Sequence, residues 1–180
     1  VDAPYFRQVE ALAMRADLIR REAKNLKILY SPLHGTGNIP VRRVLRDLGF
    51  TRVAVVPQQE MPDGNFPTAP YPNPEDPSVF RLAVELAQRE EPDLIFATDP
   101  DCDRIGVLTR TASGEYVVLT GNQTGALLCD YVIRTHRELG TMPSNPAIIK
   151  TIVTSDFGKR ICEQNGVMMA ETLTGFKYIG

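Results

Sequence analysis

Three aspartates lie within five residues of one another in the stretch Leu94-Ile-Phe-Ala-Thr-Asp-Pro-Asp-Cys-Asp-Arg-Ile-Gly-Val-Leu108. Carboxylates this close repel one another, so a folded chain tolerates them best when a cation lies between them. Oxygen ligands of this kind suit Mg²⁺, which commonly takes a few carboxylates and completes its shell with water and substrate phosphate. We therefore interpret Asp99, Asp101 and Asp103 as the candidate ligands of a magnesium ion.

Two other interpretations of the aspartates can be tested on the same residues. An EF-hand calcium loop that started at Asp99 would need Gly at its sixth position and Glu at its twelfth. Arg104 and Arg110 occupy those positions, which excludes this motif. A solvated acidic turn, with Asp103 paired to Arg104, stays open because Asp residues often occur in turns.

Strands are predicted on both sides of the aspartates. The apolar run 94–97 is typical of a buried strand, and 105–108 resumes a strand. Ala112-Ser-Gly-Glu115 then predicts a hairpin turn that leads into a strand over 116–119. Upstream, Asp76 is a plausible N-cap for a helix that returns the chain to the strand before Asp99.

The N-terminal half of the chain predicts an α/β fold. Apolar spacing indicates a helix over 4–24, a strand over 26–30, a helix over 39–48 and a strand over 51–56, an order that favours parallel pairing. Between the first strand and its helix, Gly35-Thr-Gly-Asn38 allows two interpretations. It could cradle a phosphate, or form a tight turn in which glycine takes positive φ, and we favour the turn.

The segment 57–77 is rich in proline and predicts an ordered irregular loop anchored by Phe66 and Tyr71. Further on, Asn122 can cap a helix over 123–139. The apolar run 147–153 predicts a core strand that Lys150 interrupts.

A lysine inside an apolar strand either extends its charge to solvent at an edge or faces a cleft, and the residues alone do not choose. Ser155 or Asp156 can cap the helix that follows, and a last strand is predicted from Val167 to Ala170.

Composition excludes several classes of function. The 180 residues carry a formal net charge of −2, which gives no basic footprint, so we expect no nucleic-acid partner. No apolar run predicts a membrane span. Three well-separated cysteines suggest no disulfide framework and suit a reducing cytoplasm. Because the first residue is Val1, we expect a fragment of a longer chain.

Several motifs resemble one enzyme family. Asp99-Pro-Asp-Cys-Asp-Arg-Ile-Gly-Val107 closely resembles the metal-binding loop of the α-D-phosphohexomutases, the phosphoglucomutase and phosphomannomutase superfamily, in which three Asp residues and a phosphoserine hold Mg²⁺. Cys102 stands where that family usually has a smaller residue. Ser31-Pro-Leu-His-Gly-Thr-Gly37 is similar to the start of the family's second domain, where His34 would orient the metal loop. Glu171-Thr-Leu-Thr-Gly-Phe-Lys-Tyr-Ile-Gly180 resembles a segment of its third domain.

The resemblance implies a fold and a domain division. The fold would be α/β, with two α/β/α domains built on mixed, partly parallel sheets. Residues 1–120 would form domain II with the metal-binding loop, and 121–180 an incomplete domain III. One continuous domain stays open on the residues alone.

The resemblance also implies roles for individual residues. Arg104 would bind a phosphate or clamp the aspartate loop, and Lys150 would assist proton transfer to the sugar hydroxyl. Thr174 and Gly175 would approach the substrate, whereas Phe176 and Tyr178 would pack against the protein.

The implied function is that of a Mg²⁺-dependent mutase that interconverts sugar 1-phosphate and 6-phosphate, or pentose 1- and 5-phosphate. The reaction would pass through a phosphoserine and a bisphosphate, with glucose 1,6-bisphosphate or an equivalent as activator and the other domains of the parent chain as partners. The proline-rich segment is closest to the phosphoglucomutase and phosphopentomutase branch. No serine loop of the Ser-His-Asn-Pro kind occurs, so we expect these residues alone to be inactive. A Mg²⁺-dependent phosphatase with an aspartyl nucleophile and a non-enzymatic metal- or phosphate-binding module remain alternatives.

Overall fold

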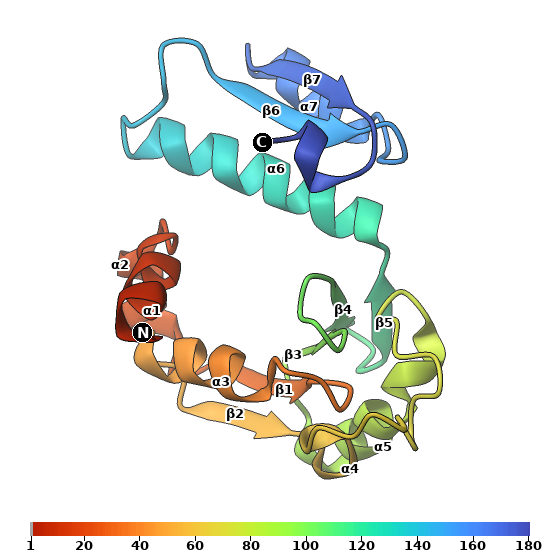
Figure 1. Cartoon of the computed structure of the whole chain (residues 1–180). Helices are drawn as coiled ribbons and strands as arrows, with labels where there is room; N and C mark the ends of the chain where they lie inside the picture. The colour runs from red at the N-terminus through yellow and green to blue at the C-terminus, as the bar shows by residue number, and fades with distance from the viewer. Residues whose placement is uncertain (1) are drawn as a thin grey trace. The chain divides into compact units, whose positions relative to one another are not determined.

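The computed structural model describes residues 2–180, and the chain divides into two compact units between Thr120 and Gly121. Each unit is described by itself (Figure 1). The elements of the first unit are α1 (Asp2–Ala11), α2 (Ala16–Glu22), β1 (Lys27–Ser31), α3 (Asn38–Asp47), β2 (Arg52–Val55), α4 (Pro57–Glu60), η1 (Pro77–Phe80), α5 (Arg81–Glu90), β3 (Leu94–Thr98), β4 (Ile105–Arg110) and β5 (Tyr116–Leu119).

The first unit is built on a mixed five-stranded sheet with the strand order β2-β1-β3-β4-β5. Strand β1 pairs in parallel with β2 and with β3, while β3, β4 and β5 pair antiparallel. The connection lengths explain this pattern, since parallel neighbours need a long crossover and antiparallel neighbours can be joined by a short turn. The predicted α/β fold with a partly parallel sheet is confirmed.

Apolar side chains cover both faces of this sheet, because successive residues of a strand point to opposite sides. On one face, Leu29, Ile95 and Leu108 form a core with Ala83 and Ala87 of α5. On the other face, a second cluster joins the sheet to α3; its members include Ile28, Tyr30, Phe96, Val41 and Leu45. The aspartate loop therefore leaves a strand that is buried on both sides.

The second unit has two parallel strands, two α-helices and one short 3-10 helix. Its elements are α6 (Gly121–Glu138), β6 (Ala147–Thr151), α7 (Phe157–Gln164), β7 (Met168–Thr172) and η2 (Phe176–Tyr178). Its small core contains Ile133 of α6, Cys162 of α7 and Val167 just before β7. No helix within residues 2–180 is both long and apolar enough to cross a membrane.

Two predicted helix boundaries are wrong. The single helix over 4–24 is two helices, α1 and α2, because the N–H groups of Leu12 and Ala13 turn back to carbonyls three residues earlier and tighten the chain into a turn. Asn122 does not cap α6 but lies inside its first turn, where its Oδ1 accepts a hydrogen bond from the Ser155 N–H at 2.9 Å.

Other predicted caps are confirmed or resolved by the structure. Asp76 Oδ1 accepts the Ser78 N–H at 2.9 Å and so caps the turn η1, which leads directly into α5. At the start of α7 the hydroxyl of Ser155 accepts the Phe157 N–H at 3.1 Å. Asp156 makes no such cap bond. The choice left open between these two residues therefore falls to Ser155.

The proline-rich segment is ordered, as predicted, but different residues anchor it. Tyr71 is 68% exposed and Phe66 is only half-buried, whereas Ala69 and Pro74 are fully enclosed. His34 provides a further anchor, because its ring bonds to the Met61 carbonyl and to the Thr68 hydroxyl. The segment therefore encloses Ala69 and Pro74, and not the two aromatic residues that were expected to anchor it.

Candidate metal centre

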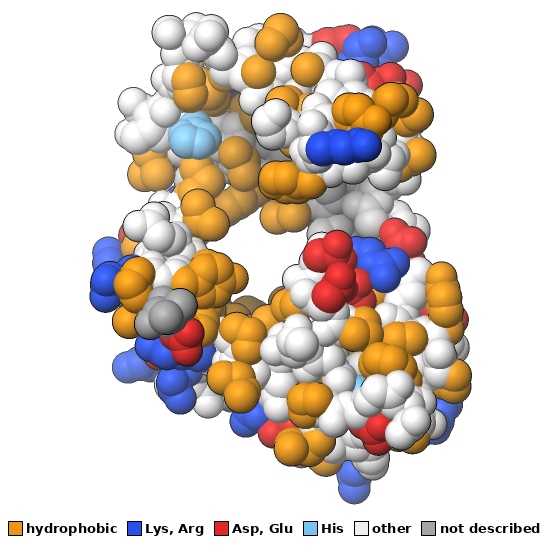
Figure 2. Space-filling view, in the orientation of Figure 1, with side chains coloured by type: hydrophobic (Ala, Val, Ile, Leu, Met, Phe, Trp, Pro, Cys, Tyr) orange, Lys and Arg blue, Asp and Glu red, His pale blue; other side chains and the backbone are white. Residues whose placement is uncertain are grey.

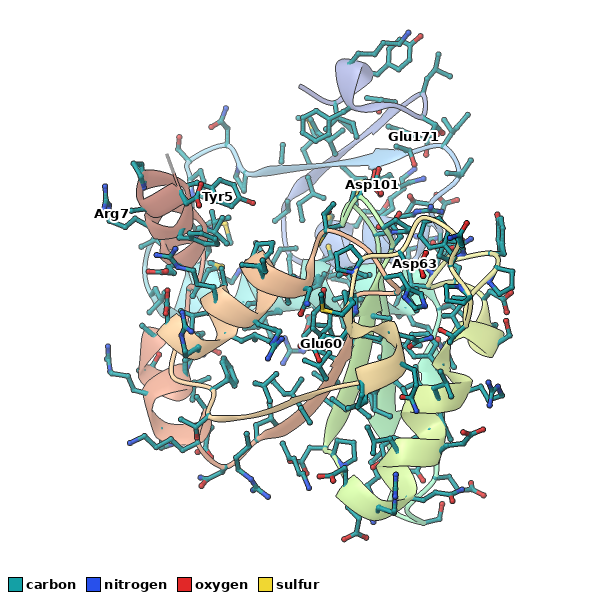
Figure 3. All side chains as sticks on the ribbon, turned by 60° about the horizontal axis from the view of Figure 1, so that its bottom comes forward. Tyr5, Arg7, Glu60, Asp63, Asp101 and Glu171 are labelled. Atoms are coloured by element: carbon teal, nitrogen blue, oxygen red, sulfur yellow. The ribbon has the colours of Figure 1, made fainter. Side chains whose placement is uncertain are left out.

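The three aspartates lie together on the loop that leads from β3 to β4. One carboxylate oxygen of each of Asp99, Asp101 and Asp103 lies within 4.8 Å of the others. Asp99 is buried, while Asp101 and Asp103 are exposed. Figure 2 shows acidic side chains gathered on the surface over this loop, and Figure 3 shows Asp101 on it. The structure thus brings together the three carboxylates that the sequence singled out.

Arg104 holds the buried member of this cluster from two sides. Its backbone N–H donates to Asp99 Oδ1 at 2.9 Å, and its Nε donates to Asp99 Oδ2 at 2.8 Å. The guanidinium also lies 3.7 Å from Asp103 and remains half exposed. Of the two roles expected for Arg104, clamping the loop is the one that these contacts display.

The backbone of the loop is tightly folded around the same residues. The Cys102 N–H donates to the Asp99 carbonyl at 3.0 Å. Cys102 itself has φ of +66°, a left-handed conformation that side-chain-bearing residues adopt at some cost. The turn that this produces directs the aspartates toward one another.

The electrostatics of the cluster leave negative charge on its exposed side. Burial by itself would raise the pKa of Asp99, but the hydrogen bonds from Arg104 outweigh it and lower that pKa. Repulsion from Asp101, and then from Asp99, raises the pKa of Asp103. Arg104 supplies one positive charge to three carboxylates, and the net negative charge that remains fits a hard divalent ion such as Mg²⁺.

The Gly35-Thr36-Gly37 turn lacks the positive-φ glycine of the favoured interpretation, and two of the N–H groups considered for a phosphate are already bonded within the protein. Positive φ occurs at Leu33 and His34, not at the glycines. The N–H of Gly35 bonds to the Pro32 carbonyl, and the N–H of Thr36 bonds to the Pro100 carbonyl, so neither is directed at a phosphate. His34 contacts the proline-rich segment instead of the metal loop, contrary to its expected role.

Sequence reasoning did not find the contacts of this turn with the aspartate loop. They connect residues more than sixty positions apart, and they depend on β1 lying beside β3. The signal that could have found them is the pair of glycines at the end of a predicted strand, because parallel neighbouring strands end at the same edge of a sheet.

Lys150, Thr174 and Gly175 belong to the second unit. Lys150 is buried, and its Nζ lies 2.5 Å from Glu171 Oε2 and 3.2 Å from Asp156 Oδ1. The hydrogen bond that Nζ donates to Glu171, and then the one that it donates to Asp156, raise the pKa of the lysine against the lowering effect of burial. The side chain is therefore held as an ammonium ion.

The turn after β7 presents the other two residues expected to meet substrate. Thr174 is exposed, and Gly175 has φ of +127°, a conformation that favours glycine. The expectation that Phe176 and Tyr178 pack against the protein is wrong here, since they are 84% and 45% exposed. Both lie in η2, outside the small core formed by α6, α7 and the strands.

Comparison with known proteins gives matches over most of the chain. Residues 3–114 match the family model for phosphoglucomutase/phosphomannomutase, alpha/beta/alpha domain II, and residues 120–180 match the model for domain III. A phosphoglucomutase of Staphylococcus haemolyticus is 39% identical over 155 residues, which is 86% of this chain and 28% of the relative. The chain thus spans little more than a quarter of that relative's length.

Solved structures agree on the fold. A phosphoglucomutase/phosphomannomutase family protein from Burkholderia thailandensis has a TM-score of 0.67 at 21% identity, covering 91% of this chain and 34% of its own. The N-acetylphosphoglucosamine mutase of Aspergillus fumigatus, in complex with GlcNAc-6P and magnesium, has a TM-score of 0.52 at 14% identity, covering 92% and 34%.

Proposed function

Because the chain belongs to the phosphoglucomutase/phosphomannomutase family, we propose that it supplies the metal-binding part of a Mg²⁺-dependent phosphosugar mutase. Such an isomerase moves a phosphoryl group between the 1- and 6-positions of a hexose, or the 1- and 5-positions of a pentose, through a phosphoserine and a bisphosphate. The observation that carries the proposal is the convergence of Asp99, Asp101 and Asp103 within 4.8 Å on a loop inside the matched domain II region.

The proposed metal site would use the three carboxylates as protein ligands. Bound Mg²⁺ would supply positive charge that neutralises the oxygens of the transferring phosphoryl group. Asp101 and Asp103 are exposed and present their oxygens to solvent, while Asp99 is fixed by Arg104. The A. fumigatus relative that was solved with magnesium supports this choice of ion.

The remaining residues have proposed roles that follow from their charge. Arg104 is half exposed and would place a fixed positive charge beside the substrate phosphate. Lys150 is held as an ammonium ion whose three N–H groups bond Glu171, Asp156 and the Thr154 carbonyl. To assist proton transfer to a sugar hydroxyl, as proposed, it would exchange one of these bonds for a bond to the hydroxyl. Thr174 and Gly175 would contact the substrate from an exposed turn.

The contacts of Asp99 argue against the phosphatase alternative. An aspartyl nucleophile needs an oxygen free to approach phosphorus in line. Both oxygens of Asp99 accept hydrogen bonds from Arg104, and the side chain is 1% exposed. Held in this way, Asp99 cannot turn toward a substrate phosphorus, whereas a spare lone pair on its oxygens can still face a cation that lies between it, Asp101 and Asp103.

The test is an activity assay of the protein that joins these residues to the remaining mutase domains. With Mg²⁺ and a trace of glucose 1,6-bisphosphate, we expect conversion of glucose 1-phosphate to glucose 6-phosphate, and ribose 1-phosphate serves as the second substrate. Asp101→Asn should abolish conversion, whereas Glu85→Gln, which removes an exposed carboxylate of α5, should not. Residues 1–180 alone should show no turnover.

Other outcomes would select the alternatives. Release of inorganic phosphate without isomerisation would favour the phosphatase. Metal binding with neither product would favour a binding module.

A further inference from the structure

The turn Gly35-Thr36-Gly37 lies directly against the aspartate loop. Thr36 donates two hydrogen bonds to one acceptor, the carbonyl oxygen of Pro100: its backbone N–H at 2.8 Å and its hydroxyl at 2.9 Å. Pro100 stands between Asp99 and Asp101 in the chain. The peptide group that separates two of the candidate metal ligands is therefore held in place by the neighbouring turn.

Gly35 allows the two backbones to approach this closely. A Cβ at this position would lie 2.4 Å from Pro100 Cα and 2.6 Å from the Pro100 carbonyl oxygen. These are backbone atoms that no side-chain rotation can move away. Gly35 does not have positive φ, so the requirement for glycine is one of space between the two loops.

Gly37 makes the second close approach, to the residue before Asp99 and to the residue between Asp101 and Asp103. A Cβ there would lie 2.6 Å from Tyr30 Oη, 2.8 Å from Thr98 Oγ1 and 2.9 Å from Cys102 Sγ. Thr98 is the last residue of β3, and Cys102 stands between Asp101 and Asp103. The turn thus contacts residues on both sides of Asp99 and Asp101.

A buried hydrogen bond completes the support. Tyr30 of β1 and Thr98 of β3 are joined through their hydroxyls at 2.8 Å, and the Tyr30 side chain is fully buried. Burial raises the pKa of Tyr30, which keeps the phenol neutral. This bond ties the carboxyl ends of two parallel strands together where the turn and the aspartate loop emerge.

We propose that Gly35, Thr36 and Gly37, backed by Tyr30 and Thr98, are positioning residues that hold the aspartate loop in its metal-binding shape. This inference rests on the proposed metal site. In it, the turn keeps three mutually repelling carboxylates close together before a cation binds. Pro100, which the turn bonds, and Cys102, which lies close to Gly37, alternate with the three aspartates. Support of this kind raises metal affinity because the ligands need no reordering on binding.

The first test measures Mn²⁺ binding to the chain, using the paramagnetic resonance signal of free Mn²⁺. Removing an outer support of a metal site typically costs 10–100-fold in affinity, so we expect Gly35→Ala to weaken binding about 10-fold or more. Thr36→Val, which loses the hydroxyl bond and keeps the shape, should weaken it several-fold, by about one lost hydrogen bond. Thr36→Ser, which keeps the hydroxyl, should bind nearly as the unaltered chain does.

The matched control is Gly64→Ala. Gly64 belongs to the same unit, and nothing lies within 4 Å of a Cβ at this position. Circular dichroism should show the same fold for all variants. If Gly35→Ala fails to fold, the affinity of Thr36→Val tests the proposal. This variant should fold because Thr36 is exposed and valine has no more heavy atoms than threonine.

A second measurement needs no metal. Gly37→Ala should push Cys102 Sγ outward, and the rate at which a thiol reagent labels Cys102, followed by mass spectrometry of its peptide, should rise. Cys162, which is fully buried in the other unit, provides an internal reference.

The outcomes separate this inference from the proposed function. Suppose that Asp101→Asn loses Mn²⁺ binding while Gly35→Ala and Thr36→Val bind Mn²⁺ with unchanged affinity. This result would overturn the positioning role and leave the metal centre intact. An unaltered chain that binds no Mn²⁺, or binds it equally after Asp101→Asn, would overturn the metal centre and the positioning role with it.

Discussion

Arg104 Nε lies 2.8 Å from Oδ2 of Asp99, and the backbone N–H of Arg104 bonds the other oxygen of the same carboxylate. One end of this pair is buried, since the Asp99 side chain is 1% exposed, and the other end is half exposed. The arrangement keeps a charged carboxylate stable inside the protein while leaving cationic surface beside the two exposed aspartates.

Arg104→Ala should destabilise the first unit. Asp99 would keep its backbone partner but lose a charge-assisted hydrogen bond in a buried place, and with allowance for the exposure of Arg104 we expect a loss of about 1–2 kcal/mol. Urea denaturation followed by circular dichroism measures this. Arg46→Ala, which removes an exposed arginine paired only at 3.4 Å with Asp47, should change stability far less; equal losses in both variants would contradict the clamp.

Asp103→Asn should have opposite effects on the melting temperature in the absence and in the presence of Mg²⁺. Its carboxylate is repelled by Asp101 and Asp99, so the metal-free variant should melt at a slightly higher temperature than the unaltered chain. In millimolar Mg²⁺ the unaltered chain should melt at the higher temperature. A cation that binds only the folded state stabilises it, and the variant lacks one of the proposed ligands. Thermal unfolding of Glu85→Gln, which removes a distant exposed carboxylate, should respond to Mg²⁺ as the unaltered chain does. If Mg²⁺ raised the melting temperature of Asp103→Asn as much as that of the unaltered chain, this would count against Asp103 as a metal ligand.

The sequence predicted those features that depend on neighbours along the chain. The apolar residues on either side of the aspartates mark the strands β3 and β4, and Asp76 caps its turn as its residue type suggests. What it missed depends on contacts across the sheet. Gly35 and Gly37 are needed because β1 ends beside β3. No periodicity in the sequence specifies that Pro100 will lie against them.

The same distinction explains the errors in detail. Tyr71 is apolar enough to predict an anchor, but the space beneath the proline-rich segment fits Ala69 and Pro74. Asn122 is of a residue type that often caps helices, yet its side-chain oxygen accepts the N–H of Ser155, thirty-three positions later. Residue type gives a preference, and tertiary contacts decide whether that preference is realised.

Lys150 should give the second unit a stability that is lost in alkali. The ammonium faces Glu171 and Asp156, which raise its folded pKa above the ordinary 10.5, and it also donates to the Thr154 carbonyl. Its contribution is then fully present below pH 10.5 and disappears as the pH rises through the folded value. The difference in urea midpoint between the unaltered chain and Lys150→Met should therefore be constant from pH 7 to 9 and shrink above about pH 10.5. Lys159→Met, an exposed lysine on α7, should show no such change; a constant difference for Lys150→Met up to pH 12 would mean that its partners do not hold the charge.

Gly106→Ala should loosen the proline-rich segment from the sheet. Gly106 lies on β4 opposite Ala97, and a Cβ there would lie 2.2 Å from the Pro74 carbonyl oxygen and 3.0 Å from the Phe80 ring. Overpacking of this kind typically costs about 1–3 kcal/mol, and we expect the upper part of that range because the nearest atom belongs to the backbone. Limited proteolysis should then cut within 57–77 faster than in the unaltered chain, while Gly64→Ala, inside the same segment but with open space around it, should leave the rate unchanged. Cleavage at the same rate in Gly106→Ala would mean that the segment is held by His34 and its other contacts without Pro74.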